Sequence, residues 1–125
     1  MLWQRRQPPS KNKGAVYEDA AKRLTETAGF KTLAQNYRCR GGELDIICSR
    51  KNSLCFIEVK YRKSNSHGHA LEQVTRSKQQ RILLAAKTYL NENKQYQNHA
   101  IRFDVIAITS LQNELQFDWI ENAFY

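Results

Sequence analysis

The sequence of 125 residues has no long hydrophobic run, which excludes a membrane-spanning helix. Its longest unbroken apolar stretch covers residues 82–86, whereas a bilayer requires roughly 18 residues. The first residues also lack the apolar segment of a secretory signal, because Trp3 is followed by polar and basic residues and by Pro8-Pro9. The sequence therefore predicts a soluble protein of the cytoplasm.

Cysteine is scarce, and the short motifs of several enzyme classes are absent. Cys39, Cys48 and Cys55 are odd in number and form no C-x-x-C pair, which argues against a zinc site and a disulfide framework. No phosphate-binding glycine loop, dinucleotide fingerprint or G-x-S-x-G sequence occurs. We therefore expect free thiols, and neither a nucleotide-cofactor enzyme nor a covalent hydrolase.

Acidic residues are few relative to basic ones. Twenty Lys and Arg against twelve Asp and Glu give a net charge of +8 and a pI near 9.6. Residues 1–99 hold nineteen bases and eight acids, whereas residues 100–125 hold one base and four acids. Such a basic body favours a polyanionic partner. Nucleic acid fits better than a membrane surface, because no basic amphipathic helix stands alone.

Both prolines lie near the N-terminus. Residues 1–13 contain them together with four bases and no acid, and they show no helical or strand periodicity. They predict a flexible basic tail. The remaining residues, 14–125, fit a single domain. This domain is expected to begin with a helix from Gly14 to Ala28, which carries an apolar stripe and is ended by Gly29.

The rest of the chain alternates strand and helix patterns. A second long helix is expected from Thr75, a suitable N-cap, to Asn91. The order is helix, three strands, helix and two strands, which predicts an α/β protein with a central mixed sheet flanked by helices. The expected strands cover residues 30–37, 43–49, 54–61, 101–109 and 114–120.

The second and third strands predict a hairpin with a defined register. A two-residue turn at Lys51-Asn52 sets Cys48 opposite Cys55, Asp45 opposite Glu58 and Glu43 opposite Lys60. Because side chains alternate along a strand, one face of this hairpin is apolar and the other carries the charged residues. The expected apolar face holds Leu44, Ile46, Cys48, Cys55, Ile57, Val59 and Tyr61.

The charged face of this hairpin predicts a cation site. Like charges directly opposite each other on paired strands are destabilising, so a positive group is expected between Asp45 and Glu58. Mg²⁺ is suited to this position because it prefers oxygen ligands and is often bound by one or two carboxylates. The alternative is a solvated polar face on which Glu43 and Lys60 form a cross-strand ion pair.

These residues resemble a known superfamily. Glu58-Val59-Lys60, with Asp45 on the neighbouring strand, is similar to the site motif of the PD-(D/E)xK nucleases, whose restriction-endonuclease-like αβββαβ core matches the predicted order. Residues 42–47 and 56–62 more closely resemble the YraN-like family of bacterial proteins, which is similar in fold to archaeal Holliday-junction resolvases. The resemblance covers the chain from Gly14 to Phe124 and extends to residues 35–38, 102–105 and 122–124.

The resemblance implies catalytic roles for several residues. Asp45 and Glu58 would bind Mg²⁺ or Mn²⁺, and Lys60 would orient or deprotonate the attacking water. Glu18 would match the extra acidic residue of resolvase-like members, although an i,i+4 ion pair with Lys22 is an equally good explanation from the residues. The chain departs from the family pattern at Tyr17, where a glycine is common.

Further residues are candidates for accessory roles. Gln73 stands where superfamily members often place a polar residue, although a solvent-facing glutamine is the alternative. The basic residues nearest the motif form a candidate track for phosphates: Arg38, Arg40, Arg62, Lys63, Arg76, Lys78 and Arg81.

Two functions follow from this pattern. One is a Mg²⁺-dependent nuclease acting on nucleic-acid phosphodiester bonds, with structured or branched DNA as the expected substrate. The other is a non-catalytic nucleic-acid-binding module on the same fold. Cleavage of a two-fold-symmetric junction would favour a homodimer.

Overall fold

The computed structural model describes residues 9–63 and 74–125, and of residues 9–13 and 63 only the backbone. Its order of helices and strands is the predicted one, except that a short 3-10 helix follows the second long helix. The elements are α1 (Pro9–Thr27), β1 (Lys31–Cys39), β2 (Gly42–Arg50), β3 (Ser53–Lys63), α2 (Arg76–Glu92), η3 (Lys94–Tyr96), β4 (Ala100–Leu111) and β5 (Glu114–Ile120). α1 therefore begins before the predicted Gly14.

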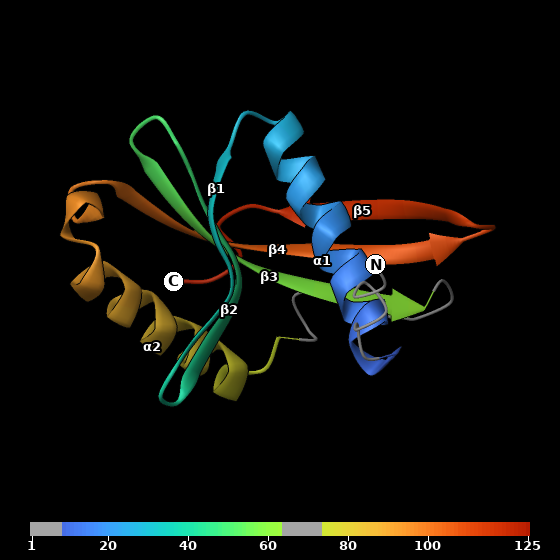
Figure 1. Ribbon diagram of the computed structural model, residues 1–125, viewed down its shortest axis with the longest axis horizontal. Helices are drawn as coiled ribbons and strands as arrows, with labels where there is room; N and C mark the ends of the chain where they lie inside the picture. Colours follow the sequence, from blue (N-terminus) through green and yellow to red (C-terminus); the bar gives the residue numbers. More distant parts are fainter. Residues whose placement is uncertain (1–8, 64–73) are drawn as a thin grey trace, which may run out of the picture.

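The five strands form one mixed sheet in the order β1-β2-β3-β4-β5. Neighbours are antiparallel except for β3 and β4, which are parallel and are joined through α2. α1 and α2 pack against opposite faces of the sheet (Figure 1). The prediction of an α/β fold with a central mixed sheet between helices is confirmed.

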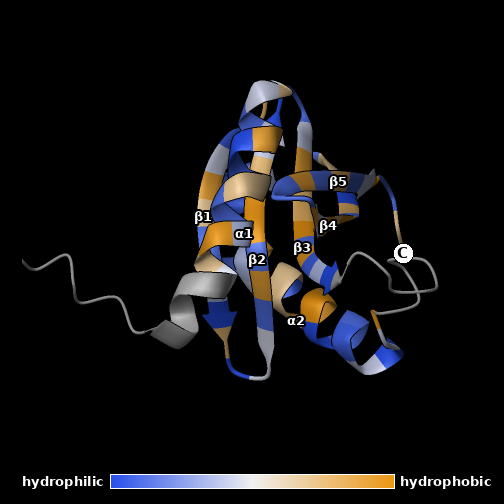
Figure 2. Ribbon diagram, turned by 90° about the vertical axis from the view of Figure 1, so that its right-hand side faces the viewer, coloured by the Kyte–Doolittle hydropathy of each residue, from blue (hydrophilic) through white to orange (hydrophobic). Residues whose placement is uncertain are grey.

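Each face of the sheet has its own hydrophobic core, because β2 and β3 carry apolar residues on both sides. Figure 2 shows the hydrophobic segments of these two strands in orange. Phe56 and Ile47 pack with Ile82 and Tyr89 of α2. On the α1 side, the core consists of Ala21, Phe30, Ile46, Cys48, Cys55, Ile57, Ile106 and Ile108. The thiols of Cys48 and Cys55 are buried and free, as expected.

The predicted hairpin register is confirmed near the turn and ends short of the charged residues. Cys48 pairs with Cys55, and the ladder continues as far as Ile46 opposite Ile57. Beyond that point β2 stays paired with β1 but separates from β3. Asp45 and Glu58 are therefore not a ladder pair, and neither are Glu43 and Lys60.

The placement of Leu44 with Ile46 and Cys48 was wrong. Leu44 is buried in the core under α2, whereas Ile46 lies in the core under α1. β2 thus changes the face that it buries around Asp45, because its first residues pack on α2 instead of following β3. Gly42 allows this close contact, since a Cβ there would lie 2.8 Å from the backbone N of Ala85.

Thr75 caps α2 as predicted, since its side chain accepts a hydrogen bond from the N–H of Lys78. In the part of the chain that the structure describes, no helix has the length and apolar character needed to cross a bilayer.

Candidate active site

Asp45 and Glu58 meet where β2 separates from β3. The N–H of Val59 donates a 2.8 Å hydrogen bond to Oδ2 of Asp45, so this side chain bridges the two strands where the backbone ladder has ended. The carboxyl groups of Asp45 and Glu58 also form a hydrogen bond with each other. The separation of the strands creates room for both side chains between the two backbones.

The environment of this pair favours a shared proton. Glu58 is only 4% exposed, and its burial together with the nearby charge of Asp45 raises the pKa of Glu58 to about 8. Burial also raises the pKa of Asp45, and the hydrogen bonds from Val59 and Glu58 oppose that rise. The two carboxyl groups therefore titrate together rather than independently. Oε1 of Glu58 is buried without a hydrogen-bond partner.

The ammonium group beside the pair belongs to Lys78 of α2. Its Nζ lies 3.7 Å from Oε2 of Glu58 and hydrogen-bonds to Oε2 of Glu43. Lys60 is half-buried two residues after Glu58, and its charge lowers the pKa of Glu58 less than that of Lys78 does. The alternative of a Glu43–Lys60 ion pair was wrong, because the charged groups that contact Glu43 come from α2 and β1.

Glu43 is the centre of a group of basic residues. Nη1 of Arg38 lies 3.9 Å from Oε1 of Glu43, and Nη2 of Arg81 lies 3.6 Å from the same oxygen. The contact with Lys78 and these two ion pairs lower the pKa of Glu43. The carboxylate thus holds three cations of the predicted phosphate track at the edge of the site.

α1 places Glu18 beside Asp45. Glu18, Asn36, Glu43 and Asp45 line a small cavity of about 70 Å³. Burial and the charge of Asp45 raise the pKa of Glu18, whereas a hydrogen bond with Asn36 lowers it. Lys22, the alternative partner of Glu18, pairs with Glu26 at 3.9 Å. The structure therefore brings Glu18 to the site, as the resemblance implied.

The pair fits a divalent cation of the magnesium type. Carboxylate oxygens are the ligands that Mg²⁺ prefers, two are enough when water completes the shell, and the unpartnered Oε1 of Glu58 has capacity for one more interaction. Within residues 9–63 and 74–125, no three His, Cys, Asp or Glu side chains are close enough together to hold a metal ion. Asp45 and Glu58 would thus hold the ion without Glu18 as a third ligand.

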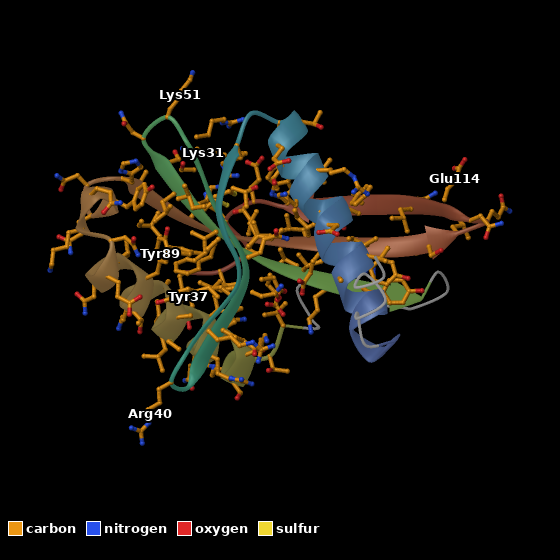
Figure 3. The ribbon with its side chains drawn as sticks, in the orientation of Figure 1. Lys31, Tyr37, Arg40, Lys51, Tyr89 and Glu114 are labelled. Atoms are coloured by element: carbon orange, nitrogen blue, oxygen red, sulfur yellow. The ribbon has the colours of Figure 1, made fainter. Side chains whose placement is uncertain are left out.

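The remaining predicted site residues lie in different places. Arg62 is 3.9 Å from Asp118 of β5, and Arg76 is exposed in the first turn of α2. Arg40 points away from the molecule at the β1–β2 turn (Figure 3). Gln73 and the side chain of Lys63 lie outside the described residues.

Two features of the site were missed from the sequence. Asn36, the partner of Glu18, has a φ of 53°, a left-handed conformation that asparagine adopts more readily than most residues. No local pattern marked it. Tyr17, where the chain departs from the family pattern, stacks on Tyr61 with ring centroids 4.2 Å apart. The two rings belong to the residues that precede Glu18 and follow Lys60 in the sequence.

The sheet order, the helices on both faces and the carboxyl pair at the strand separation together define an α/β protein with a restriction-endonuclease-like core. A family model described as "Uncharacterised protein family UPF0102" matches residues 17–108. The chain belongs to this family, which is the YraN-like family.

Bacterial relatives match almost the full chain. A UPF0102 protein of Aeromonas hydrophila is 43% identical over 123 residues, which cover 98% of this chain and 92% of the relative. A UPF0102 protein of Saccharophagus degradans is 46% identical over 111 residues, covering 89% of this chain and 91% of the relative. These similarities establish the family but do not assign an activity.

Proposed function

We propose that this protein is a Mg²⁺- or Mn²⁺-dependent phosphodiesterase that acts on nucleic acid. The observation that carries the proposal is the contact between the buried carboxyl group of Glu58 and the half-buried one of Asp45, together with an oxygen of Glu58 that is buried without a partner. Burying two acidic groups together costs stability unless a cation or a proton compensates. A purely structural sheet has no need of such a pair.

Each residue of the candidate site would have its own role in the reaction. Asp45, oriented by the N–H of Val59, and Glu58 would hold the cation. When bound, it would supply Lewis-acid chemistry, which neutralises charge on the phosphate and makes water more acidic. Lys60 would orient the attacking water on the same strand, and Glu18 would accept a hydrogen bond at the α1 side of the site.

The charge of the molecule supports a nucleic-acid substrate. Arg38 and Arg81 are exposed and flank the carboxyl pair through Glu43, so basic groups reach the solvent next to the candidate centre. Phosphate contacts from such residues position a nucleic acid without reading its sequence. The chain offers no base-reading motif, which fits a substrate recognised by its backbone or shape.

A cleavage assay tests this function. The purified protein is incubated with duplex, single-stranded, flap and four-way DNA in Mn²⁺, in parallel with Glu58→Gln and Lys60→Ala. The matched control is Asp19→Asn, which removes an exposed acid next to Glu18. We expect cleavage of at least one substrate by the wild type and the control, and its loss in the other two variants.

Binding without cleavage, equal in all four proteins and indifferent to Mn²⁺, would contradict the proposal and support the non-catalytic binding module. Cleavage that survives Glu58→Gln would also contradict it, because the activity would then not come from this site.

A further inference from the structure

Lys78, which the sequence assigned to the predicted phosphate track, lies between two carboxylates. Its ammonium group lies beside Oε2 of Glu43 and 3.7 Å from Oε2 of Glu58. The side chain is 20% exposed, so the charge is partly withdrawn from water. No motif residue of β2 or β3 supplies this cation, since it comes from the first turn of α2.

The docking of α2 fixes this position. Thr75 caps the helix by accepting a hydrogen bond from the backbone N–H of Lys78. Gly42 permits β2 to lie close to the next turn of α2. Glu43 then binds the ammonium more closely than Glu58 does. Lys78 therefore has a close partner outside the carboxyl pair, Glu43, and a more distant partner within it, Glu58.

We propose that Lys78 is the resident counter-ion of the Asp45–Glu58 pair, that it gives up Glu58 when a divalent cation binds, and that Glu43 then keeps its ammonium at the site to bind a phosphate oxygen of the nucleic acid. This inference rests on the proposed function, and it assigns Glu43 as a positioning residue.

The physical basis is competition for the same charge. An ammonium and a divalent cation cannot both neutralise Glu58 without repelling each other, so each lowers the affinity of the other by the same factor. Because Glu43 hydrogen-bonds to Lys78 from outside the carboxyl pair, the displaced ammonium stays next to the scissile phosphate. A Lys side chain is a compact point charge suited to such a contact.

Calorimetric titration with Mn²⁺ tests the first part. Lys78→Met is compared with Arg76→Met, which removes an equal charge from an exposed position on the same helical turn. We expect Lys78→Met to bind Mn²⁺ about tenfold more tightly than the wild type, within the usual range for coupled sites, and Arg76→Met to differ little. Lys78→Arg keeps the charge and should stay near the wild type.

Equal Mn²⁺ affinities for Lys78→Met and Arg76→Met would overturn the counter-ion role, and so would weaker binding by Lys78→Met. If the wild type still binds Mn²⁺ and cleaves DNA, the proposed function would survive that result. If no variant binds Mn²⁺, both proposals fail together. Should Lys78→Met not fold, Lys78→Gln replaces it in the same comparison.

The second part is tested by binding of a fluorescent duplex oligonucleotide in Ca²⁺, with Glu43→Gln and Lys78→Met against Lys87→Met, which removes an exposed base of α2 outside the predicted phosphate track. We expect the first two to lose about tenfold in affinity and the control to lose clearly less. Losses no greater than that of the control would overturn the phosphate role of Lys78.

Discussion

At the scale of single residues, the carboxyl groups of Asp45 and Glu58 set the chemistry of the site. Their proximity could be predicted from strand alternation, because that pattern put both acids on one face of a hairpin. The ammonium beside them could not be predicted. Lys78 is distant in sequence from both, and only the docking of α2 on β2 brings it there.

Neutral substitutions in this pair should stabilise the metal-free protein. Above pH 8, where Glu58 has lost its proton, Asp45→Asn and Glu58→Gln each remove one charge of the pair while keeping the shape and the capacity for hydrogen bonds. Relief of the repulsion should raise the free energy of unfolding by a few tenths to about 1 kcal/mol. Thermal unfolding in a chelator measures this change, with Asp19→Asn as the control. A loss of more than about 1 kcal/mol would mean that the charges stabilise the fold.

The stability of the metal-free protein should fall as the pH rises. The pKa of Glu58 is raised from its ordinary 4.5 to about 8, so the folded state keeps a proton that the unfolded state releases between these values. The contribution of Glu58 to the free energy of unfolding is therefore greatest below about pH 4.5, declines between pH 4.5 and about pH 8, and is constant at higher pH. The total loss is on the order of a few kcal/mol.

Denaturant unfolding of the wild type and Glu58→Gln across pH 5 to 9 isolates this contribution, because the other titrating groups are common to both proteins. The difference between the two should grow with pH in favour of the variant. A difference that does not change with pH would show that Glu58 ionises as freely as in the unfolded chain.

At the scale of helices and strands, the sequence predicted every long element, since periodicity and caps such as Thr75 are local features. The face of the sheet on which Leu44 is buried could not be predicted from such local features. Alternation assumes an unbroken ladder, whereas β2 leaves β3 at Asp45 because its first residues, beginning with Gly42, pack on α2. This irregularity is what opens the candidate site, so the error falls at that site.

Gly42 should be intolerant of a side chain. A Cβ at this position would lie 2.8 Å from both the backbone N of Ala85 and the carbonyl O of Arg81, which are held by α2 and cannot move independently. Gly42→Ala should therefore cost about 1–3 kcal/mol and shift α2 together with Lys78. Gly14→Ala is the control, because a Cβ there meets nothing within 4 Å.

The control should be neutral or more stable by up to about 1 kcal/mol, as expected for replacing glycine in a helix. Chemical denaturation measures both variants. Equal stability of the two would contradict the close packing of α2 on β2.

At the scale of the whole molecule, the charge is divided between the two parts of the chain. The four acids of residues 100–125 lie on or after β4 and β5, and one of them, Asp118, neutralises Arg62. Arg38, Lys78 and Arg81 lie instead around Glu43 of β2, next to the carboxyl pair. The total charge was evident from the sequence, but this division of partners was not.

Nucleic-acid binding should be chiefly electrostatic. If about five phosphates are neutralised, the logarithm of the binding constant should fall with the logarithm of salt concentration at a slope of about −4 to −5 for duplex DNA. Arg81→Met should reduce this slope by about 1. Fluorescence anisotropy at several salt concentrations measures it, and an affinity that does not change with salt would show that the basic surface has no part in binding.

The central claim is that Asp45 and Glu58 hold a divalent cation, and titration calorimetry with Mn²⁺ tests it most directly. The wild type and Asp19→Asn should bind one ion with equal affinity, whereas Asp45→Asn and Glu58→Gln should lose at least about tenfold, because each variant removes one of only two ligands. Absence of binding by the wild type, or the same affinity in all four proteins, would contradict the account.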